Sequence, residues 1–170
     1  HGGSDDFSRA RSGASATYNI LRYGANYDRV LRHDWRLRAN FNGQATRDAL
    51  VPGEQFGVGG ASSVRGFNER EVASDSGFMG SLELYTPNLC TASSATQCRT
   101  LAFYDAANVS RNRTLPGEQV RTSIASVGLG LRVNVDKSFS VQMDYGQVID
   151  GSDTRAKGDK RLHVKASLSY

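Results

Sequence analysis

The chain has 170 residues, of which 38% are hydrophobic and 22% charged, and its formal net charge is +4. This length is typical of one domain, and no segment contains the roughly 18 consecutive apolar residues that a spanning helix requires. Arginine and aspartate are interspersed rather than gathered in a dense basic patch, which argues against a nucleic-acid-binding protein. Membrane β-strands remain compatible with this composition, because only every second residue of such a strand faces lipid.

The start of the chain predicts two extended segments. The polar stretch from His1 to Gly13 is expected to be a loop or a frayed terminus. An extended segment follows over 14–31, with a tight turn at His33-Asp34. Apolar and polar residues then alternate over 35–42, which is the period of a strand and not that of a helix.

A glycine-rich stretch begins after a turn that contains Pro52. We predict a strand over 54–60 and a hinge at Gly59 and Gly60, because glycine permits backbone conformations that other residues avoid. A long loop is expected over about 61–77. Its head is the motif Val64-Arg65-Gly66-Phe67, in which one arginine follows the glycines.

A phosphate-binding loop is the alternative for this stretch. Gly57-x-Gly59 superficially resembles part of a nucleotide-binding motif. That motif needs a helix directly after its glycines. The residues over 68–77 are too polar and aperiodic to form one, so the nucleotide interpretation is disfavoured.

The remainder of the chain alternates in the period of strands, and we count about eight strands and no helix in all. Short and long connections take turns, with a turn at Asp136-Lys137 and loops over 110–120 and 149–160. Soluble sandwiches alternate in the same way. The long, regular last strands and the unequal connections favour an all-β, antiparallel transmembrane β-barrel, in which strands have about 9–11 residues and periplasmic turns are short.

Such a barrel would divide the side chains between lipid and a polar lumen. The residues expected to face the lumen are Arg132, Asp144 and Lys165. The residues expected to face lipid are Val127, Leu129, Leu131, Val133, Val141, Met143, Val164 and Leu168.

No arrangement typical of an enzyme is present in the sequence. His1, His33 and His163 lack the spacing of metal ligands. Ser62 and Ser63 lack the setting of a nucleophile elbow. We therefore expect no catalytic residue, no metal, no cofactor and no small-molecule substrate.

A resemblance to a known family rests on three parts of the sequence. These are Glu54-Gln55-Phe56-x-x-Gly59-Gly60-x-x-Ser63-Val64-Arg65-Gly66-Phe67, then Asp75-x-Gly77, and then Ser81-Leu82-Glu83-Leu84. Together they resemble the two-partner secretion transporters of Gram-negative outer membranes. The resemblance extends from about Tyr18 to Tyr170 and corresponds to the C-terminal part of a family member. It implies that residues 1–170 belong to an outer-membrane barrel domain, roughly the C-terminal half of a sixteen-stranded barrel.

The resemblance also implies a role for Arg65. In the family, the arginine motif lies at the tip of a long extracellular loop that folds back into the lumen. A guanidinium in such a place requires a carboxylate, since it cannot lose its charge. Phe103-x-Asp105 resembles the family's Phe-x-Asp-x-Gly motif, so Asp105 is the expected wall partner and Glu83 the reserve. The glycine of that motif is Ala107 in this chain, and Phe67 is expected to pack beside Phe103.

Cys90 and Cys98 flank a turn rich in serine, threonine and alanine. An even number of cysteines at short separation permits one disulfide, which would suit an oxidising periplasm. Two unrelated thiols are the alternative. We expect the disulfide, at the periplasmic end of the barrel.

The function implied by the resemblance is export of a large unfolded exoprotein, an adhesin or haemolysin, from the periplasm to the cell surface. The implied partners are this cargo and the lipid of the outer membrane, with no nucleic acid. One alternative is a barrel assembly factor of the same superfamily. Another is a small autonomous eight-stranded barrel with a structural or ligand-binding role, which the strand count would fit.

Overall fold

The computed structural model describes residues 10–14, 17–91, 95–136 and 138–169. In these residues no helix is long and apolar enough to cross a membrane. They form strands and one short 3-10 helix: β1 (Leu21–Val30), η1 (Arg32–Asp34), β2 (Arg36–Ala45), β3 (Phe56–Val58), β4 (Val72–Ser74), β5 (Ser76–Tyr85), β6 (Thr96–Ser110), β7 (Arg121–Val135), β8 (Phe139–Asp150) and β9 (Lys160–Leu168).

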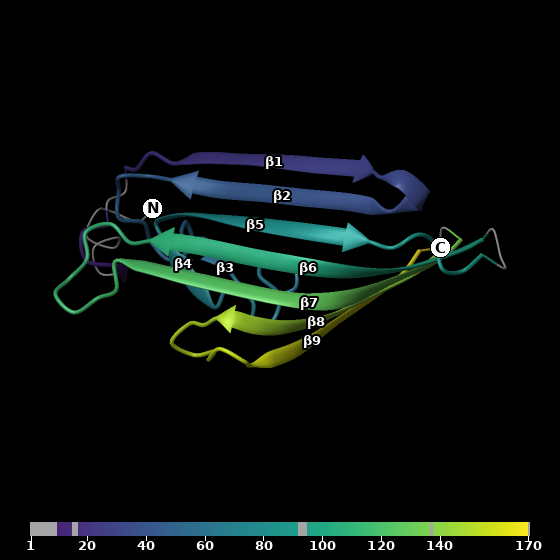
Figure 1. The fold of residues 1–170 in the computed structure, drawn as a ribbon. Coiled ribbons are helices and arrows are strands. Elements are labelled where there is room, and N and C mark those ends of the chain that lie inside the picture. Colours follow the sequence, from purple (N-terminus) through teal and green to yellow (C-terminus); the bar gives the residue numbers. More distant parts are fainter. Residues whose placement is uncertain (1–9, 15–16, 92–94, 137, 170) are drawn as a thin grey trace.

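Seven of these strands form one antiparallel sheet in the order β1-β2-β5-β6-β7-β8-β9. The sheet curls, and the long connection between β2 and β5 lies at one end (Figure 1). The short connections between β1 and β2 and between β7 and β8 lie at the other end, together with the connection over 86–95. We call these the loop end and the turn end. The loop end carries the connections over 46–75, 111–120 and 151–159. In the described residues the sheet is not closed, and β1 and β9 are its edges.

The expected strand over 54–60 is shorter in the structure and lies outside the main sheet. Its ordered part is β3, which pairs with β4 in a separate two-stranded sheet within the connection between β2 and β5. The strand ends after Val58 because Gly59 and Gly60 adopt φ values of 109° and 103°, which lie in a region that favours glycine. The main sheet consequently has seven described strands instead of about eight.

The start of the chain also differs from expectation. The extended segment predicted over 14–31 is a strand only from Leu21. The turn at His33-Asp34 is present as η1, with φ of 58° at His33 and 60° at Asp34. Asp136 likewise has a positive φ of 52°, as a tight turn after β7 requires. Lys137 and Tyr170 lie outside the described residues.

The register of the sheet separates two faces. One apolar row crosses the outer face through Leu37, Leu84, Ala102, Leu129, Tyr145 and Leu162, each paired with the next. The eight residues that we expected to face lipid all lie on this outer face. Arg132, Asp144 and Lys165 lie on the opposite, inner face.

The connection between β2 and β5, which we call the docked loop, packs on the inner face near the loop end. Val58, Val64 and Phe67 from this loop form an apolar cluster with strand residues, which are Ala107, Val109, Ile124 and Val148. Val64 and Phe67 have no exposed surface. Full burial of one such side chain stabilises a folded structure by about 1.5–3 kcal/mol of free energy. This cluster therefore contributes strongly to the binding of the loop to the sheet.

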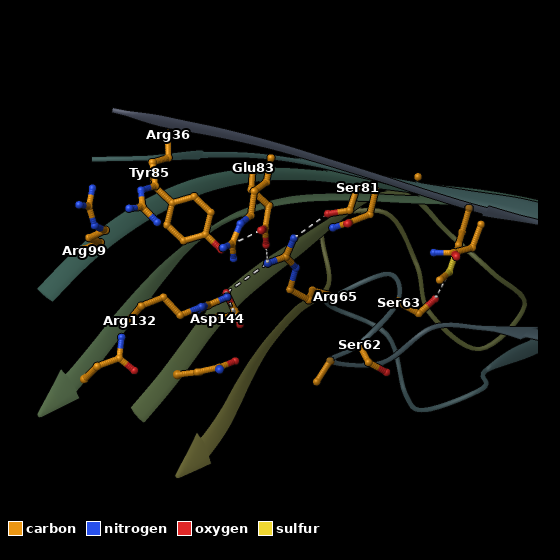
Figure 2. A pocket seen from close by; sticks show the side chains of 18 of the residues that line it. Arg36, Ser62, Ser63, Arg65, Ser81, Glu83, Tyr85, Arg99, Arg132 and Asp144 are labelled. Carbon is orange, nitrogen blue, oxygen red and sulfur yellow. Dashed lines mark hydrogen bonds and ion pairs between the residues drawn. The ribbon is translucent and has the colours of Figure 1, made fainter. Parts of the chain in front are cut away.

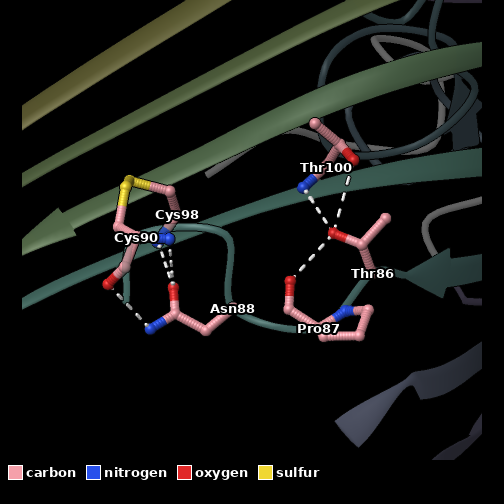
Figure 3. Close-up of a disulfide and its surroundings, with 6 residues drawn as sticks. All are labelled: Thr86, Pro87, Asn88, Cys90, Cys98 and Thr100. Atoms are coloured by element: carbon pink, nitrogen blue, oxygen red, sulfur yellow. Dashed lines mark hydrogen bonds between the residues drawn. A yellow bond between two sulfur atoms is a disulfide. The ribbon is translucent and has the colours of Figure 1, made fainter. Parts of the chain in front are cut away.

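The disulfide between Cys90 and Cys98 is present, as predicted, with a Cα–Cα distance of 5.2 Å. It lies at the turn end, in the connection between β5 and β6 (Figure 3). The Asn88 side-chain oxygen accepts hydrogen bonds from the backbone N–H groups of Cys90 at 3.2 Å and Cys98 at 2.8 Å. The asparagine therefore holds both ends of the cross-linked turn.

A charge on the outer face is expected to cost far more than one on the inner face. Met143 and Gln142 are adjacent on β8 and point to opposite faces. Met143→Arg should lower the free energy of unfolding in lipid by roughly 2–4 kcal/mol, because it places a cation in hydrocarbon. Gln142→Arg is the matched control and should cost much less. Folding titrations in lipid vesicles would test this, and equal costs for the two variants would contradict the assignment of the faces.

Candidate functional site

The motif Val64-Arg65-Gly66-Phe67 lies where the docked loop comes closest to the sheet. Gly66 has a φ of 95°. A Cβ atom on Gly146 of β8 would lie 2.9 Å from the Gly66 nitrogen and 3.1 Å from the Arg65 carbonyl carbon. The loop backbone thus rests directly on the backbone of β8, and a side chain at position 146 would displace it.

The Arg65 side chain forms a bidentate ion pair with Asp105 of β6. Arg65 Nε donates to Asp105 Oδ2 at 2.7 Å, and Arg65 Nη2 donates to Oδ1 at 2.8 Å. The backbone N–H of Arg65 also donates to Oδ2, at 3.1 Å. Arg65 is 4% exposed and Asp105 is fully buried, so this is a desolvated, charge-assisted contact of the stronger kind.

Two further carboxylates bind Arg65 (Figure 2), and the Phe103 ring lies against its guanidinium. Nη1 donates to Glu83 Oε1 at 2.7 Å and to Asp144 Oδ1 at 3.3 Å. The guanidinium carbon lies 3.6 Å from the centre of the Phe103 ring, within the range of a cation–π contact. Arg65 therefore binds side chains of β5, β6 and β8 at once.

The balance of charge explains why the arginine stays ionised here. Burial by itself would lower the pKa of Arg65, but the hydrogen bond and charge of Asp105, with the charges of Glu83 and Asp144, raise it above its ordinary value. Asp144 is also bound by Arg132, at 2.8 and 3.0 Å. Glu83 accepts a hydrogen bond from the Tyr85 hydroxyl at 2.8 Å. Asp144 and Glu83 thus each have a second hydrogen-bond donor besides Arg65. Asp105 accepts three hydrogen bonds from Arg65 itself, so none of the three buried charges is left uncompensated.

The residues singled out from the sequence have different surroundings in the structure. Arg65, Asp105, Glu83 and Phe103 come together as described above. Phe67 does not pack beside Phe103: it lies in the cluster with Val64 and Ala107, whereas Phe103 clusters with Tyr85 and Leu101. Ala107, at the position of the family's glycine, is 4% exposed and supplies its methyl group to the loop-binding cluster.

Sequence reasoning missed several partners of the docked loop. The Gly66 N–H donates to His163 Nε2 of β9 at 3.1 Å, and Ser81 Oγ lies 2.6 Å from Asp105. Asp144 was expected in the lumen but not as a partner of Arg65. No signal short of the strand register could have found these contacts, because the partners lie 16 to 97 residues from the motif.

A second buried ion pair, between Arg11 and Asp75, lies at the loop end. Asp75 binds Arg11 through both carboxylate oxygens and accepts the N–H groups of Leu50 at 2.9 Å and Asn112 at 2.7 Å. Arg11 also donates to the Leu50 carbonyl at 2.7 Å and the Asn112 carbonyl at 2.9 Å. Arg11 lies in a bend outside any strand, as expected of a loop, but it is 8% exposed and is therefore not part of a frayed terminus. Residues 1–9 lie outside the described part.

The charge of Asp75 is stabilised by these contacts. Burial alone would raise the pKa of Asp75, but the hydrogen bond from Arg11 and those from the Leu50 and Asn112 amides lower it below its ordinary value. In the described residues no group of histidine, cysteine and carboxylate side chains is arranged to hold a metal ion. In the described residues, the ion pairs of Arg65 and Arg11 connect the docked loop and the start of the chain to the strands and connections around them.

Comparison with protein families identifies the chain. Residues 3–133 match the model of the family described as haemolysin secretion/activation protein ShlB/FhaC/HecB. The chain belongs to this family. No curated protein sequence matches it.

Two solved structures resemble this chain. CdiB from Acinetobacter baumannii is 28% identical, with a TM-score of 0.62 over 89% of this chain and 26% of that one. CdiB from Escherichia coli is 18% identical, with a TM-score of 0.77 over 91% of this chain and 28% of that one; this second likeness concerns the fold alone. The chain spans about a quarter of the length of these structures.

Proposed function

We propose that this chain is the C-terminal part of an outer-membrane transporter of the two-partner secretion type. It would export a large unfolded exoprotein, of the adhesin or haemolysin kind, from the periplasm to the cell surface. Family membership supports this function. The short connections between β1 and β2 and between β7 and β8 lie at the turn end and the long docked loop lies at the other, which supports an orientation with the turn end in the periplasm.

The barrel of this proposal is larger than the described sheet. The edges of β1 and β9 would carry unpaired backbone groups in the membrane, and hydrocarbon offers such groups no partner. Further strands of the complete protein would pair with both edges, toward a barrel of roughly sixteen strands. The open edges favour this reading over an autonomous small barrel.

The observation that carries the proposal is the docked loop with Arg65. It crosses the inner face of the curled sheet and binds three strand carboxylates there. A loop held in the lumen of a barrel narrows the path that an exoprotein must take. Passage of the cargo then requires the loop to move, and the ion pairs set the energy of that movement.

A covalent bond between the docked loop and β5 should stop export. Ser63 Oγ lies 3.0 Å from Met79 Sδ of β5, so these two side chains meet where the docked loop contacts the sheet, and mass spectrometry would show whether cysteines placed there are joined by a disulfide after oxidation. In the complete protein with Ser63→Cys and Met79→Cys, we expect export to be lost under oxidising conditions and restored by a reductant. Proteins in the culture medium of producing and non-producing strains would be compared.

The single-cysteine variants are the controls, and both should export under either condition. Two results would count against the proposal. One is an oxidised double variant, shown by mass to be cross-linked, that exports as well as the reduced protein. The other is a complete wild-type protein whose production adds nothing to the culture medium.

A further inference from the structure

The inner face on the turn-end side of Arg65 carries cations in a row across the strands. Arg99 of β6 pairs with Arg132 of β7, Arg132 with Gln142 of β8, and Gln142 with Lys165 of β9. Arg36 of β2 lies in the next row, where it pairs with Tyr85. We call Arg36, Arg99, Arg132 and Lys165 the cationic belt.

Arg36, Arg99 and Arg132 of the belt line an open recess of about 440 Å³ between the docked loop and the turn end, and Lys165 pairs with Gln142, which also lines it. Figure 2 shows Arg36, Arg99 and Arg132 on the side of Arg65 that lies away from the loop residues Ser62 and Ser63. The carboxylates that line this recess are Glu83 and Asp144, and Arg65 binds both. The recess therefore has an excess of positive charge.

The belt is only partly neutralised by the protein. Arg99 binds Asp34 from the turn end at 2.6 Å, and Arg132 binds Asp144. Within the described residues, Arg36 and Lys165 have no ion pair, and Arg36 Nε is buried without a hydrogen-bond partner. Arg99 and Arg132 also face each other as like charges on adjacent strands, an arrangement that is unfavourable unless an anion intervenes.

We propose that the cationic belt binds the carboxylates of an extended, acidic polypeptide segment that enters from the turn end. The inference rests on the proposed function, since it names a chemical property of the exported chain. Rings of arginine and lysine select anions in membrane pores. An extended chain presents alternate side chains about 7 Å apart, so successive carboxylates meet the belt in turn just before they reach the docked loop.

Peptide block of the ion current through the complete protein in a planar bilayer tests the belt. Hexaglutamate and hexalysine are the probes, added on the turn-end side. Hexaglutamate should block at lower concentration than hexalysine. In the Arg36→Gln/Lys165→Gln variant, hexaglutamate should bind roughly three- to tenfold more weakly, because each exposed charge contact is individually weak. Raising the salt concentration should reduce the difference.

The Arg29→Gln/Arg32→Gln variant is the matched control. Arg29 lies near the turn end on the outer face, where it pairs with Leu37, and Arg32 of η1 lies near Leu84 of that face. Their loss removes two positive charges, as the belt variant does, without touching the belt. Equal block by the two peptides, or unchanged hexaglutamate block in the belt variant, would overturn the inference and leave the proposed function standing. A complete protein that gives no current would overturn both.

Discussion

Replacing Arg65 by alanine is expected to release the docked loop while the strands stay paired. The change leaves Asp105 fully buried with the Ser81 hydroxyl as its remaining side-chain donor. Loss of one partner of a buried ion pair costs about 3–5 kcal/mol, because the other charge is left uncompensated. Hydrogen exchange at the amides of residues 64–67 should accelerate at least about 100-fold, whereas amides of β7 should keep their protection.

The partner substitution should be milder. Asp105→Ala leaves Arg65 with Glu83 and Asp144, so its guanidinium keeps two anions. In the double variant, the two changes should be non-additive by about 0.5–3 kcal/mol, as expected for groups in direct contact. Arg38→Ala is the control: Arg38 is paired with Asp28 at a solvent-exposed position, where ion pairs contribute little. Additive losses would show that Arg65 does not act through Asp105.

Replacing Asp75 by asparagine is the second change with a large expected effect. The variant removes the charge that Arg11 binds, and it replaces one of the two oxygens that accept the Leu50 and Asn112 amides by an NH2 group that cannot accept. Arg11 would then be a buried cation without a counter-charge, at a cost of about 3–5 kcal/mol. The exchange rates of the Leu50 and Asn112 amides should rise by about 100-fold or more.

Acid should have the same effect on the wild-type protein. Because the folded-state pKa of Asp75 is lowered, its contribution is fully present above the unfolded value of about 3.9 and is lost as the pH falls toward the folded value. Protection of the Leu50 and Asn112 amides, corrected for intrinsic exchange, should therefore decline below about pH 4. Asp75→Asn should abolish this dependence.

Asp153→Asn is the control for these measurements. Asp153 lies exposed at the loop end and accepts one hydrogen bond, from Gln119 at 3.3 Å. Its loss should change neither the two amides nor their pH profile. If Asp75→Asn left both amides as protected as in the wild type, the buried pair would not be what holds the loop end together.

Much of the fold was predictable because the alternation of apolar and polar residues that indicates a strand is visible within a short stretch of sequence. Alternation along β7, β8 and β9 separates the apolar residues of the outer face from Arg132, Asp144 and Lys165, and the register preserves that separation. The short strand β3 could not be distinguished from a strand of the main sheet. Its three residues have an extended pattern whether they belong to the main sheet or to a separate small sheet. Only the pairing of β3 with β4 distinguishes the two arrangements.

The candidate site was predictable in part, and through the family resemblance. Arg65 and Asp105 were named from motifs, whereas Asp144, His163 and Gly146 enter the site only through strand pairing. Arg11 was missed for a related reason. It lies in a polar stretch without periodicity, and its partner Asp75 is 64 residues away, so nothing local marks it as buried.

The long separations within the site have a consequence for the order in which the protein assembles. Arg65 binds Asp144, 79 residues later, and Gly66 binds His163, 97 residues later. Contacts so distant in the chain form late, after the intervening segments have been brought together. The motif cannot reach its final position until β8 and β9 have joined the sheet. Seating of the loop is thus one of the last steps of folding, because without β8 and β9 the motif lacks the backbone of Gly146 and the side chains of Asp144 and His163.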